Sequence, residues 1–409
     1  MSSWVKSRSP RCSTRATLLA SRVRPLLLRY ASARRVAAMA QPLSAAAASQ
    51  AASTCAAPPS FSVVMLGDTM LGRLVDEKLA VLQAQGEPPA AVLGDTLPLI
   101  RAADVRILNL ECALTDHPVR WTQTPKMFHF RSSPAHSVPV LAAAGVHGVA
   151  LSNNHVLDYN EPGLHDTLRT LDSAGIARAG AGASLEEARA PGWMSVKVGS
   201  RCVRIALLGM ADHPDEWCAD GATPGINLFY PFPSPDALAW ARAAAAAALA
   251  QGADLVVLSA HYGGNWVLRP PEAVRAFTHA LMESSDVDVF FGNSAHVAQG
   301  VEIHAGKLIV YQAGDFLDDY AIDSQWHNDW GAALTARFSL LDDATSTVAR
   351  ARLASVEIAP LLLSFAHTRI APPGAPVTRA IAARMQKLSA QLGTTLSVDA
   401  HTGVLRWPA

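Results

Sequence analysis

Cysteine is scarce in this sequence, which contains five cysteines among 409 residues. No two of them stand in a CxxC motif, and two lie within the first 57 residues. This usage argues against a thiolate zinc site and a disulfide framework, and it indicates a reducing environment. Cys112 is therefore expected to be a small buried hydrophobic residue.

Acidic residues are absent from the first 57 positions, and the first one in the chain is Asp68. The same stretch carries Lys6 and eight arginines and is rich in serine and alanine, which is the composition of an organellar transit peptide. We expect residues 1–57 to be a leader for a mitochondrion or a plastid. A disordered basic tail, or an extension upstream of the true start, would have the same composition, and the protein would then be cytoplasmic.

Two further features are missing after residue 60, namely a cluster of lysine and arginine and a long apolar run. Nine of the 34 basic residues but none of the 34 acidic ones precede residue 58, so the rest of the chain is mildly acidic. A nucleic-acid partner, which requires a basic face, is therefore not expected. A transmembrane helix needs about 18–20 apolar residues, and no run reaches that length.

What the sequence does contain is a series of apolar strands that alternate with helices. Helices are predicted at 70–83, 161–174, 236–251, 271–284 and 376–392. Residues 212–235 hold five prolines and are predicted to be a long loop, and residues 333–341 and 348–358 an antiparallel strand pair. This order predicts an α/β domain over 58–370 with a mixed sheet or two stacked sheets, followed by a C-terminal helix and tail over 371–409.

Six of these strands end on polar side chains suited to binding. The residues at these ends are Asp68, Asn109 with Glu111, Asn154 with His155, His261, His296 and Asp315. Open α/β folds build their sites at such ends, so one shared pocket is predicted. Asp, Glu, Asn and His without cysteine form a ligand set for Mn, Fe, Zn or Mg. The other histidines, including His213, His279 and His304, lack this setting and are expected to be ordinary surface or core residues.

Several pocket residues allow two interpretations. Asp68 is interpreted as a metal ligand, although an aspartate before a helix also serves as an N-cap. Asn153, Asn154 and His155 follow a strand, where a polar turn would use the same residue types. A pair of divalent cations could activate a water and hold a phosphoryl or acyl oxygen. His155, if it is not a ligand, could protonate the leaving group, and Arg73 could hold an anionic group of a small-molecule or polymer substrate.

Longer motifs surround these residues. They are Gly67-Asp68-Thr69-Met70-Leu71-Gly72-Arg73, Asn109-Leu110-Glu111, Ser152-Asn153-Asn154-His155 with Leu157-Asp158, Gly180-Ala181-Gly182, His261-Tyr262-Gly263, His296-Val297 with Gln299-Gly300-Val301-Glu302, and Tyr311-Gln312-Ala313-Gly314-Asp315-Phe316. In these motifs, which run in order over about residues 61–320, the chain resembles the capsule-synthesis protein CapA family, associated with poly-γ-glutamate. That family is similar to the calcineurin-like metallophosphoesterases, which implies an αββα sandwich of the metallo-dependent phosphatase type around a two-metal site.

The resemblance also implies roles for single residues. The implied ligands, for manganese or else for iron, zinc or magnesium, are Asp68, Glu111, Asn154, His261 and His296. His155 takes the position of the histidine beside the leaving group. Independently of the resemblance, we predict a catalytic role for Arg73 and substrate binding by Asn153 and Asn293. The implied activity is hydrolysis of a phosphoester or of a γ-glutamyl-type amide, and bacterial family members act in capsule assembly at the cell surface.

The chain departs from the family pattern in two ways. The family commonly has a second histidine just before the one that matches His296, and here those positions are Asn293 and Ser294. One metal site is therefore expected to be weaker or absent, which leaves open a non-catalytic accessory or binding protein. No membrane anchor is visible in the sequence, so a capsule label would describe ancestry. A third alternative is a sugar- or peptide-binding protein that uses the aromatic loop at 217–232.

Overall fold

The computed structural model describes residues 59–340 and 350–409 of the chain. The predicted leader at 1–57 lies outside the described residues, as does the turn between the two predicted antiparallel strands. Strands of the described part are rich in branched and aromatic residues, and several are buried along their whole length. Because successive side chains of a strand point to opposite faces, such strands must be covered on both sides.

β1 (Ser60–Thr69) shows how one strand serves two apolar cores. Phe61, Val63 and Met65 pack into a central layer between two large sheets. Val64 and Leu66, which point the other way, pack in a second cluster that includes helix residues. All five side chains are almost fully buried, and burial of each such side chain stabilises the fold by about 1.5–3 kcal/mol.

One large sheet within the described residues has ten strands, with β1 in its interior. β1 pairs in parallel with β2 and β15 and antiparallel with β16, and β16 pairs antiparallel with β17. The predicted antiparallel pair is thereby confirmed for its described residues. The other strands of this sheet are β2 (Val105–Leu110), β5 (Gly148–Ala150), β6 (Ala177–Ala179), β15 (Asp315–Leu317), β16 (Trp330–Leu340), β17 (Ala351–Ser364), β18 (His367–Ile370), β19 (Ser397–Val398) and β20 (Leu405–Trp407).

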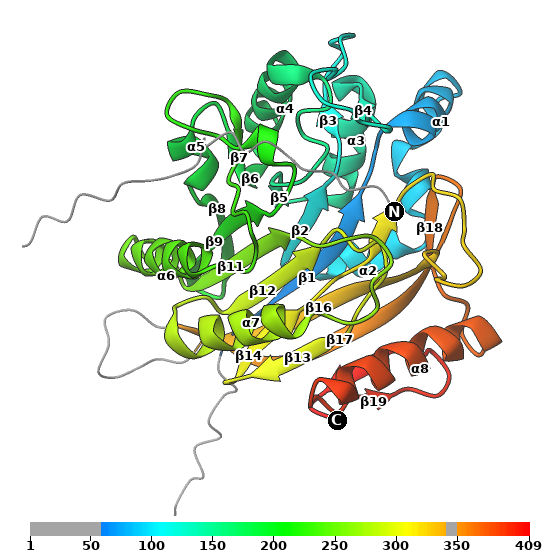
Figure 1. The fold of residues 1–409 in the computed structure, drawn as a ribbon. Helices are drawn as coiled ribbons and strands as arrows, with labels where there is room; N and C mark the ends of the chain where they lie inside the picture. The colour runs from blue at the N-terminus through cyan, green and yellow to red at the C-terminus, as the bar shows by residue number, and fades with distance from the viewer. Residues whose placement is uncertain (1–58, 341–349) are drawn as a thin grey trace, which may run out of the picture. The chain divides into compact units, whose positions relative to one another are not determined.

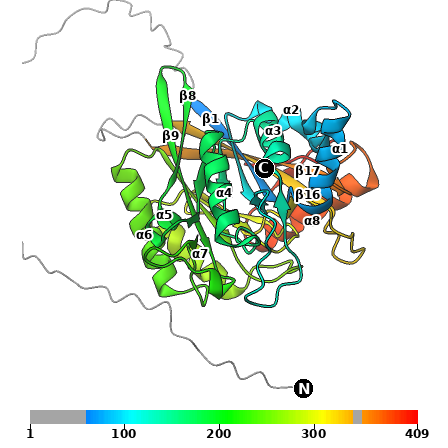
Figure 2. The ribbon, with the colours of Figure 1, turned by 90° about the horizontal axis from the view of Figure 1, so that it is seen from above.

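The second large sheet of the described part has six strands in the order β13-β14-β12-β11-β9-β8. Its four inner strands are parallel, and β13 and β8 close the two edges in antiparallel pairings. Figure 2 shows the long β8–β9 hairpin from above. The strands are β8 (Gly192–Val198), β9 (Arg201–Ala211), β11 (Leu255–His261), β12 (Val289–Asn293), β13 (Val301–His304) and β14 (Lys307–Val310).

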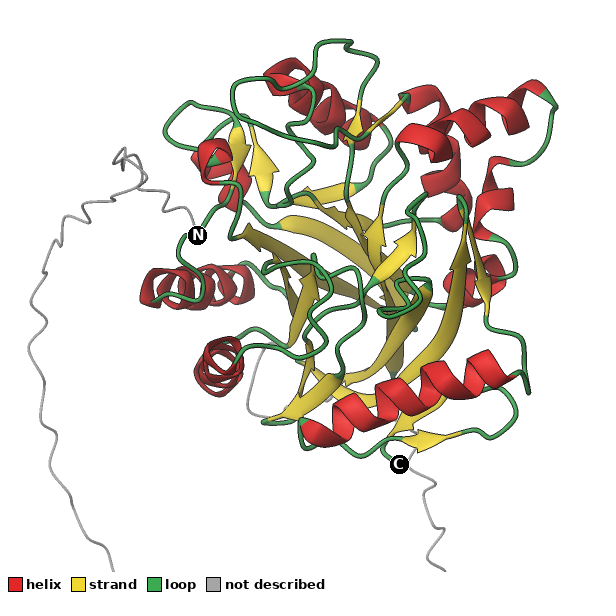
Figure 3. Ribbon diagram, turned by 45° about the vertical axis from the view of Figure 1, so that its right-hand side comes forward, coloured by secondary structure: helices red, strands yellow, loops and turns green. Residues whose placement is uncertain are grey.

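Helices cover the outer faces of the two sheets (Figures 1 and 3). The ten-stranded sheet carries α1 (Arg73–Ala84), α2 (Thr96–Ala102), α3 (Pro134–Ala144) and α4 (Asn160–Ser173), and the six-stranded sheet carries α6 (Pro235–Ala250) and α7 (Glu272–Ser284). α8 (Pro376–Gln391) contributes Ala382 and Met385 to the central layer. Shorter elements are η1 (Pro89–Leu93), β3 (Ala113–Leu114), β4 (Arg131–Ser132), β7 (Ala181–Gly182), α5 (Leu185–Arg189), η2 (Asp215–Trp217) and β10 (Gly225–Ile226).

The layer order of helix, sheet, sheet and helix confirms the predicted αββα sandwich. The five predicted helices agree with α1, α4, α6, α7 and α8 to within a few residues. Helix α3 was not predicted, because it begins at Pro134 and its helical pattern is interrupted by Pro139. A proline in the first turn is compatible with a helix because the N–H it lacks would have no intrahelical partner there. Among the described residues, no helix is long and apolar enough to cross a membrane.

Candidate metal centre

The carboxyl ends of strands from both sheets meet at one place. In the ten-stranded sheet, Asp68 of β1 is in register with Asn109 of β2 and Asp315 of β15, because these three strands are parallel. In the six-stranded sheet, the parallel strands β11 and β12 end beside one another, and β11 ends on His261. The backbone N–H of Ser294, just after β12, donates to Asp68 Oδ2 at 3.1 Å. Strand ends of the two sheets therefore face each other.

Glu111, Asn154 and His261, here called the Glu111 cluster, turn their ligand atoms toward a common point. His261 Nε2 lies 3.1 Å from Asn154 Oδ1 and 3.9 Å from Glu111 Oε1. Glu111 is fully buried, and neither of its carboxylate oxygens has a hydrogen-bond partner among the described residues. A buried carboxylate without a partner is costly, so this cluster requires a proton or a cation.

The electrostatics of the Glu111 cluster agree with a cation site. Burial raises the pKa of Glu111 well above its usual range, and the nearby Asp68 carboxylate raises that pKa further. Burial also lowers the pKa of His261 well below its usual range, with His213 acting in the same direction. The neutral imidazole of His261 is the form that binds metal, and Glu111 binds a cation in exchange for the proton that burial favours. The donor set of one carboxylate, one amide oxygen and one imidazole suits Mn, Fe or Zn.

Asp68, His296 and Asp315, here called the Asp68 cluster, form the second half of the centre. His296 Nδ1 lies 2.7 Å from Asp315 Oδ1 and 3.6 Å from Asp68 Oδ2, and one ligand atom from each residue lies within 4.8 Å of the others. Burial acts to lower the pKa of His296, but the carboxylates of Asp315 and Glu111 outweigh it and raise that pKa well above its usual range. Burial raises the pKa of Asp68 to about 6, although His296 opposes the shift. The carboxylates of this cluster thus favour the charged form of His296.

Asn293 and Ser294, at the positions of the second family histidine, are tied to their surroundings by hydrogen bonds. Asn293 Nδ2 donates to Ser259 Oγ and to the backbone oxygen of Phe291, both at 3.2 Å, so the amide is directed back into the sheet. Its Oδ1 is buried without a hydrogen-bond partner in the described part of the chain. Ser294 has a φ of 112° and its Oγ donates to Gly263 O at 3.2 Å. The Asn293 Nδ2 is therefore held by β11 and by its own strand, and substrate binding by Asn293 stays a prediction.

Asparagine side chains join the two clusters. Asn109 Nδ2 donates to Asp68 Oδ1 at 2.7 Å and lies 3.5 Å from His261 Nδ1. Asn153 Nδ2 donates to Leu110 O at 2.8 Å, and Asn153 Oδ1 accepts the backbone N–H of His155 at 3.0 Å. Asn153, also predicted to bind substrate, is fully buried and fixes the loop that carries Asn154 and His155.

His155 stands beside the Glu111 cluster with an aspartate behind it. Its Nδ1 lies 2.6 Å from Asp158 Oδ2, its Nε2 lies 4.0 Å from Glu111 Oε1, and its ring stacks on Phe130 at 3.8 Å between centroids. Burial lowers the pKa of His155 well below its usual range, and Lys126 adds to the effect. Burial raises the pKa of Asp158 to about 7, while Lys126 opposes this shift from 3.2 Å. Burial and Lys126 thus favour the neutral imidazole of His155, which lies beside Asp158.

Arg73 lies at the rim of the centre and already has a carboxylate partner. Its Nε donates to Asp319 Oδ2 at 3.1 Å, and its guanidinium lies over the rings of Phe130 and Tyr320. Its side chain remains 29% exposed, so it can still meet a ligand. Helix α1 has Gly72 as its N-cap residue and no side-chain cap. Asp68 therefore does not cap this helix, and that alternative interpretation is wrong.

His213 lies at the centre although the sequence pattern did not identify it. The His213 ring lies 5.5 Å from the His261 ring, and the neighbouring Asp212 accepts the N–H of Gly263 at 3.0 Å. The expectation that His213 is an ordinary histidine therefore misses its position. Strand β9 ends at Ala211, so Asp212 and His213 form another polar strand end. These two residues were assigned to the long loop at 212–235, and recognition of the strand that precedes them would have identified them.

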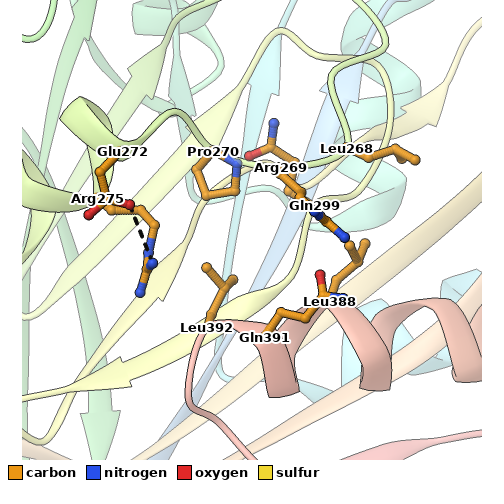
Figure 4. Close-up of a pocket in the computed structure, with 9 residues that line it drawn as sticks. All are labelled: Leu268, Arg269, Pro270, Glu272, Arg275, Gln299, Leu388, Gln391 and Leu392. Carbon is orange, nitrogen blue, oxygen red and sulfur yellow. Dashed lines mark ion pairs between the residues drawn. The ribbon is translucent and has the colours of Figure 1, made fainter.

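The aromatic loop residue Trp217 and a surface hollow beside α7 and α8 are not part of the candidate metal centre. Trp217 in the aromatic loop is buried, packs against Trp121 and has the Lys126 ammonium 4.8 Å from its ring centroid, so it is not presented to a ligand. A hollow of about 310 Å³ lies elsewhere, between the start of α7 and α8 (Figure 4). Arg269 and Gln299 are among its lining residues, and neither cluster contributes to it.

The sequence matches a family model described as "Bacterial capsule synthesis protein PGA_cap" over residues 62–320. A Mycobacterium tuberculosis protein named "Probable polyglutamine synthesis accessory protein" is 30% identical over 292 residues, which covers 64% of this chain and 76% of that protein. The "PGA biosynthesis protein CapA" of Bacillus subtilis is 28% identical, with 63% of each chain covered. The "Capsule biosynthesis protein CapA" of Bacillus anthracis is 26% identical, with 70% of this chain and 65% of that protein covered.

Among solved structures, the chain is similar to the calcineurin-like phosphoesterase YfkN of Bacillus subtilis. The identity is 12%, the TM-score is 0.42, and the alignment covers 82% of this chain and 100% of that one. A likeness this distant adds nothing about the residues of the centre.

Proposed function

The chain belongs to the family of bacterial capsule synthesis proteins, and we propose that it is a metal-dependent hydrolase of the metallophosphoesterase type. The proposal rests chiefly on one observation: Glu111 is fully buried, lacks a hydrogen-bond partner in the described part of the chain, and faces His261 Nε2 and Asn154 Oδ1. A carboxylate in that position would hold a divalent cation, for which we propose manganese, with iron, zinc and magnesium as alternatives. A cation there would act as a Lewis acid toward a phosphoryl or acyl oxygen.

The two clusters would fill in order of their charge. The Glu111 cluster would take a cation first. Glu111 must also lose the proton that burial favours, but neither of its oxygens gives up a hydrogen bond to a described residue, whereas Asp68 and Asp315 must give up their pairing with His296. Asp68, His296 and Asp315 would hold a second cation only after His296 loses the proton that its carboxylate neighbours stabilise. Metal and proton compete for the same ligand atoms, so the second site would be the weaker one.

His155 would serve as the acid for the leaving group. Asp158 fixes the ring by accepting from Nδ1, and a carboxylate in this position favours the charged imidazole that carries a second proton on Nε2. Burial and Lys126 disfavour that charge, so the proton would be readily donated. Arg73 and Lys126 at the rim would attract an anionic substrate, which we propose to be a phosphoester or a γ-glutamyl-type amide.

The test uses the full-length protein. Elemental analysis after purification should find a bound divalent metal, and Mn²⁺-dependent turnover should appear with a phosphodiester or with poly-γ-glutamate. His155→Ala should lower turnover by about 10²–10⁴-fold and leave the metal content unchanged. A protein that is metal-free, inert with both substrates and unaffected by His155→Ala would contradict the proposal.

A non-catalytic accessory role is the second candidate, and the Asp68 cluster favours it. His296 pairs with two carboxylates, and Ser294 occupies a family histidine position. One relative carries the words "accessory protein" in its name. Metal binding without turnover, together with specific binding of poly-γ-glutamate, would support this role over hydrolysis.

Residues 1–57 are proposed to direct the protein to a mitochondrion or a plastid. A fluorescent protein fused behind these residues should enter one of these organelles, and a fusion in which the eight arginines are replaced by glutamine should remain in the cytosol. Uniform cytosolic fluorescence of the unmodified fusion would contradict the proposal.

A further inference from the structure

A separate group of metal-ligating side chains lies where helix α7 packs against the edge strand β13. His279 and Glu283 are on α7, four residues apart, and Glu302 and His304 are on β13, two residues apart. Side chains at i and i+4 share one face of a helix, and those at i and i+2 share one face of a strand. The four side chains, here called the edge cluster, therefore meet across the helix–strand contact. None of them belongs to the Glu111 or Asp68 cluster.

The two imidazoles of the edge cluster lie face to face. Their ring centroids are 3.9 Å apart and their planes differ by 6°. His279 Nε2 lies 2.9 Å from Glu302 Oε1, and His304 Nε2 lies 2.8 Å from Glu283 Oε1. One ligand atom each from His279, Glu302 and His304 lies within 4.8 Å of the other two. Two imidazoles and the Glu302 carboxylate thus converge within 4.8 Å, and the Glu283 carboxylate lies beside His304.

Glu302 is oriented for this role by the residues behind it. Tyr311 OH donates to Glu302 Oε2 at 2.7 Å, and Thr278 Oγ1 lies 3.2 Å from the same phenol oxygen. These contacts occupy Oε2 and leave Oε1 directed at His279, an arrangement that is common behind metal ligands. Arg275 is a competing cation, but its Nη2 is 3.9 Å from Glu302 Oε1 and its Nη1 pairs with Glu272 at 3.5 Å (Figure 4).

We propose that the edge cluster binds one zinc-class transition-metal ion through His279, His304 and Glu302, with Glu283 as a fourth ligand. Nitrogen and oxygen donors in this ratio suit Zn²⁺ and select against Ca²⁺ and Mg²⁺, which prefer oxygen alone. Bonds of about 2.0–2.2 Å place tetrahedral ligand atoms about 3.3 Å apart. His279 and His304 are 29% and 24% exposed, which leaves their side chains room for the small rotations required. The bound ion cross-links α7 and β13 and so stabilises the edge of the six-stranded sheet.

The test measures zinc binding in the full chain, with binding at the candidate metal centre reduced by Glu111→Gln. In that background, equilibrium dialysis against Zn²⁺ should find one ion fewer per chain after the double change His279→Ala and His304→Ala. Co²⁺ in place of Zn²⁺ should give the intense visible absorption of a four-coordinate site, and the double change should abolish it. His401→Ala, which removes an exposed histidine elsewhere, should alter neither result.

Equal zinc content and equal Co²⁺ spectra with and without the double change would overturn the proposal and leave two ordinary ion pairs. Should the double variant fail to fold, His304→Gln, which keeps a side chain of similar size, provides the same comparison. Zn²⁺ should also raise the Tm of the protein with an unmodified edge cluster by a few degrees. The rise in Tm should be much smaller for either variant. None of these readouts depends on hydrolase activity, so failure of the proposed hydrolysis would not affect them.

Discussion

The Glu111 cluster and the Asp68 cluster are built from similar residue types and differ in how their charge is neutralised. Glu111 faces two neutral groups, and its oxygens have no hydrogen-bond partner among the described residues. Asp68 and Asp315 instead surround His296, which supplies a positive charge of its own. A complete set of ligand types is therefore not sufficient for a cation site. The site also needs carboxylate oxygens that no protein group already pairs, and of the two clusters only the Glu111 cluster has a carboxylate with both oxygens unpaired among the described residues.

The largest expected effect concerns stability in the Asp68 cluster. Asp315→Asn removes the carboxylate 2.7 Å from His296 Nδ1, and breaking one partner of a buried ion pair costs about 3–5 kcal/mol. We expect the free energy of unfolding, measured by urea denaturation in EDTA, to fall by that amount. Glu357→Gln is the matched control, since its half-exposed pair with Arg406 should contribute less than about 1 kcal/mol. An equal fall in the free energy of unfolding in the two variants would show that the pairing of His296 with Asp315 does not stabilise the fold.

The next largest effect concerns metal affinity in the Glu111 cluster. Glu111→Gln keeps the shape of the side chain and removes its charge, so the affinity for Mn²⁺ should fall at least about 100-fold. In EDTA the same variant should be as stable as the wild-type protein or more stable, because a buried carboxylate without a partner is lost. Calorimetric titration with Mn²⁺ and urea denaturation measure the two quantities. A variant that binds Mn²⁺ normally would place the cation elsewhere.

A smaller gain is expected from restoring the family histidine. Ser294→His adds an imidazole beside Asp68, whose Oδ2 already accepts the backbone N–H of residue 294. The affinity of the weaker ion should rise roughly tenfold, which corresponds to about 1.4 kcal/mol, while the tighter ion is unaffected. Ser294→Ala serves as control and should give no gain. Were Ser294→His to leave the second affinity unchanged, the missing histidine would not explain the weakness of this site.

The smallest effect is an expected lack of reaction at Cys112, next to Glu111. Burial raises the pKa of the Cys112 thiol to about 12, so at pH 8 the thiol is protonated and inaccessible. Iodoacetamide followed by peptide mass spectrometry should find Cys112 unmodified and the exposed Cys202 modified. Rapid modification of Cys112 in the folded protein would mean that the surroundings of Glu111 are open to solvent.

Local patterns in the sequence predicted an α/β domain with a mixed sheet or two stacked sheets, together with most strand ends. The αββα sandwich was implied by the resemblance to the CapA family. An apolar run that stops at Asp68, Asn154 or His261 can be recognised without knowing its neighbours. The residues that contact these strand ends cannot be recognised in this way, since those contacts depend on pairing between strands that are distant in the sequence. Asn109 and Asp315 were recognised as strand ends, but only the parallel register with β1 shows that both lie against Asp68.

The sequence failed where packing between elements decides the outcome. His279 and His304 were expected to be ordinary histidines, yet α7 lies on β13 and brings their rings together. Neither the helix nor the strand has a local sequence pattern that predicts this contact. The raised pKa of His296 has the same origin, because Asp315 begins β15 and Glu111 follows β2, far apart in the sequence. Charge balance is thus the property of this centre that a linear sequence reveals least.

The most direct test is the position of Mn²⁺ in a crystal of the full-length protein, located by anomalous scattering at the manganese edge. At a limiting Mn²⁺ concentration we predict a peak bounded by Glu111, Asn154 and His261, and a weaker peak or none between Asp68, His296 and Asp315. A single peak in the Asp68 cluster, or no peak in either cluster, would contradict the account.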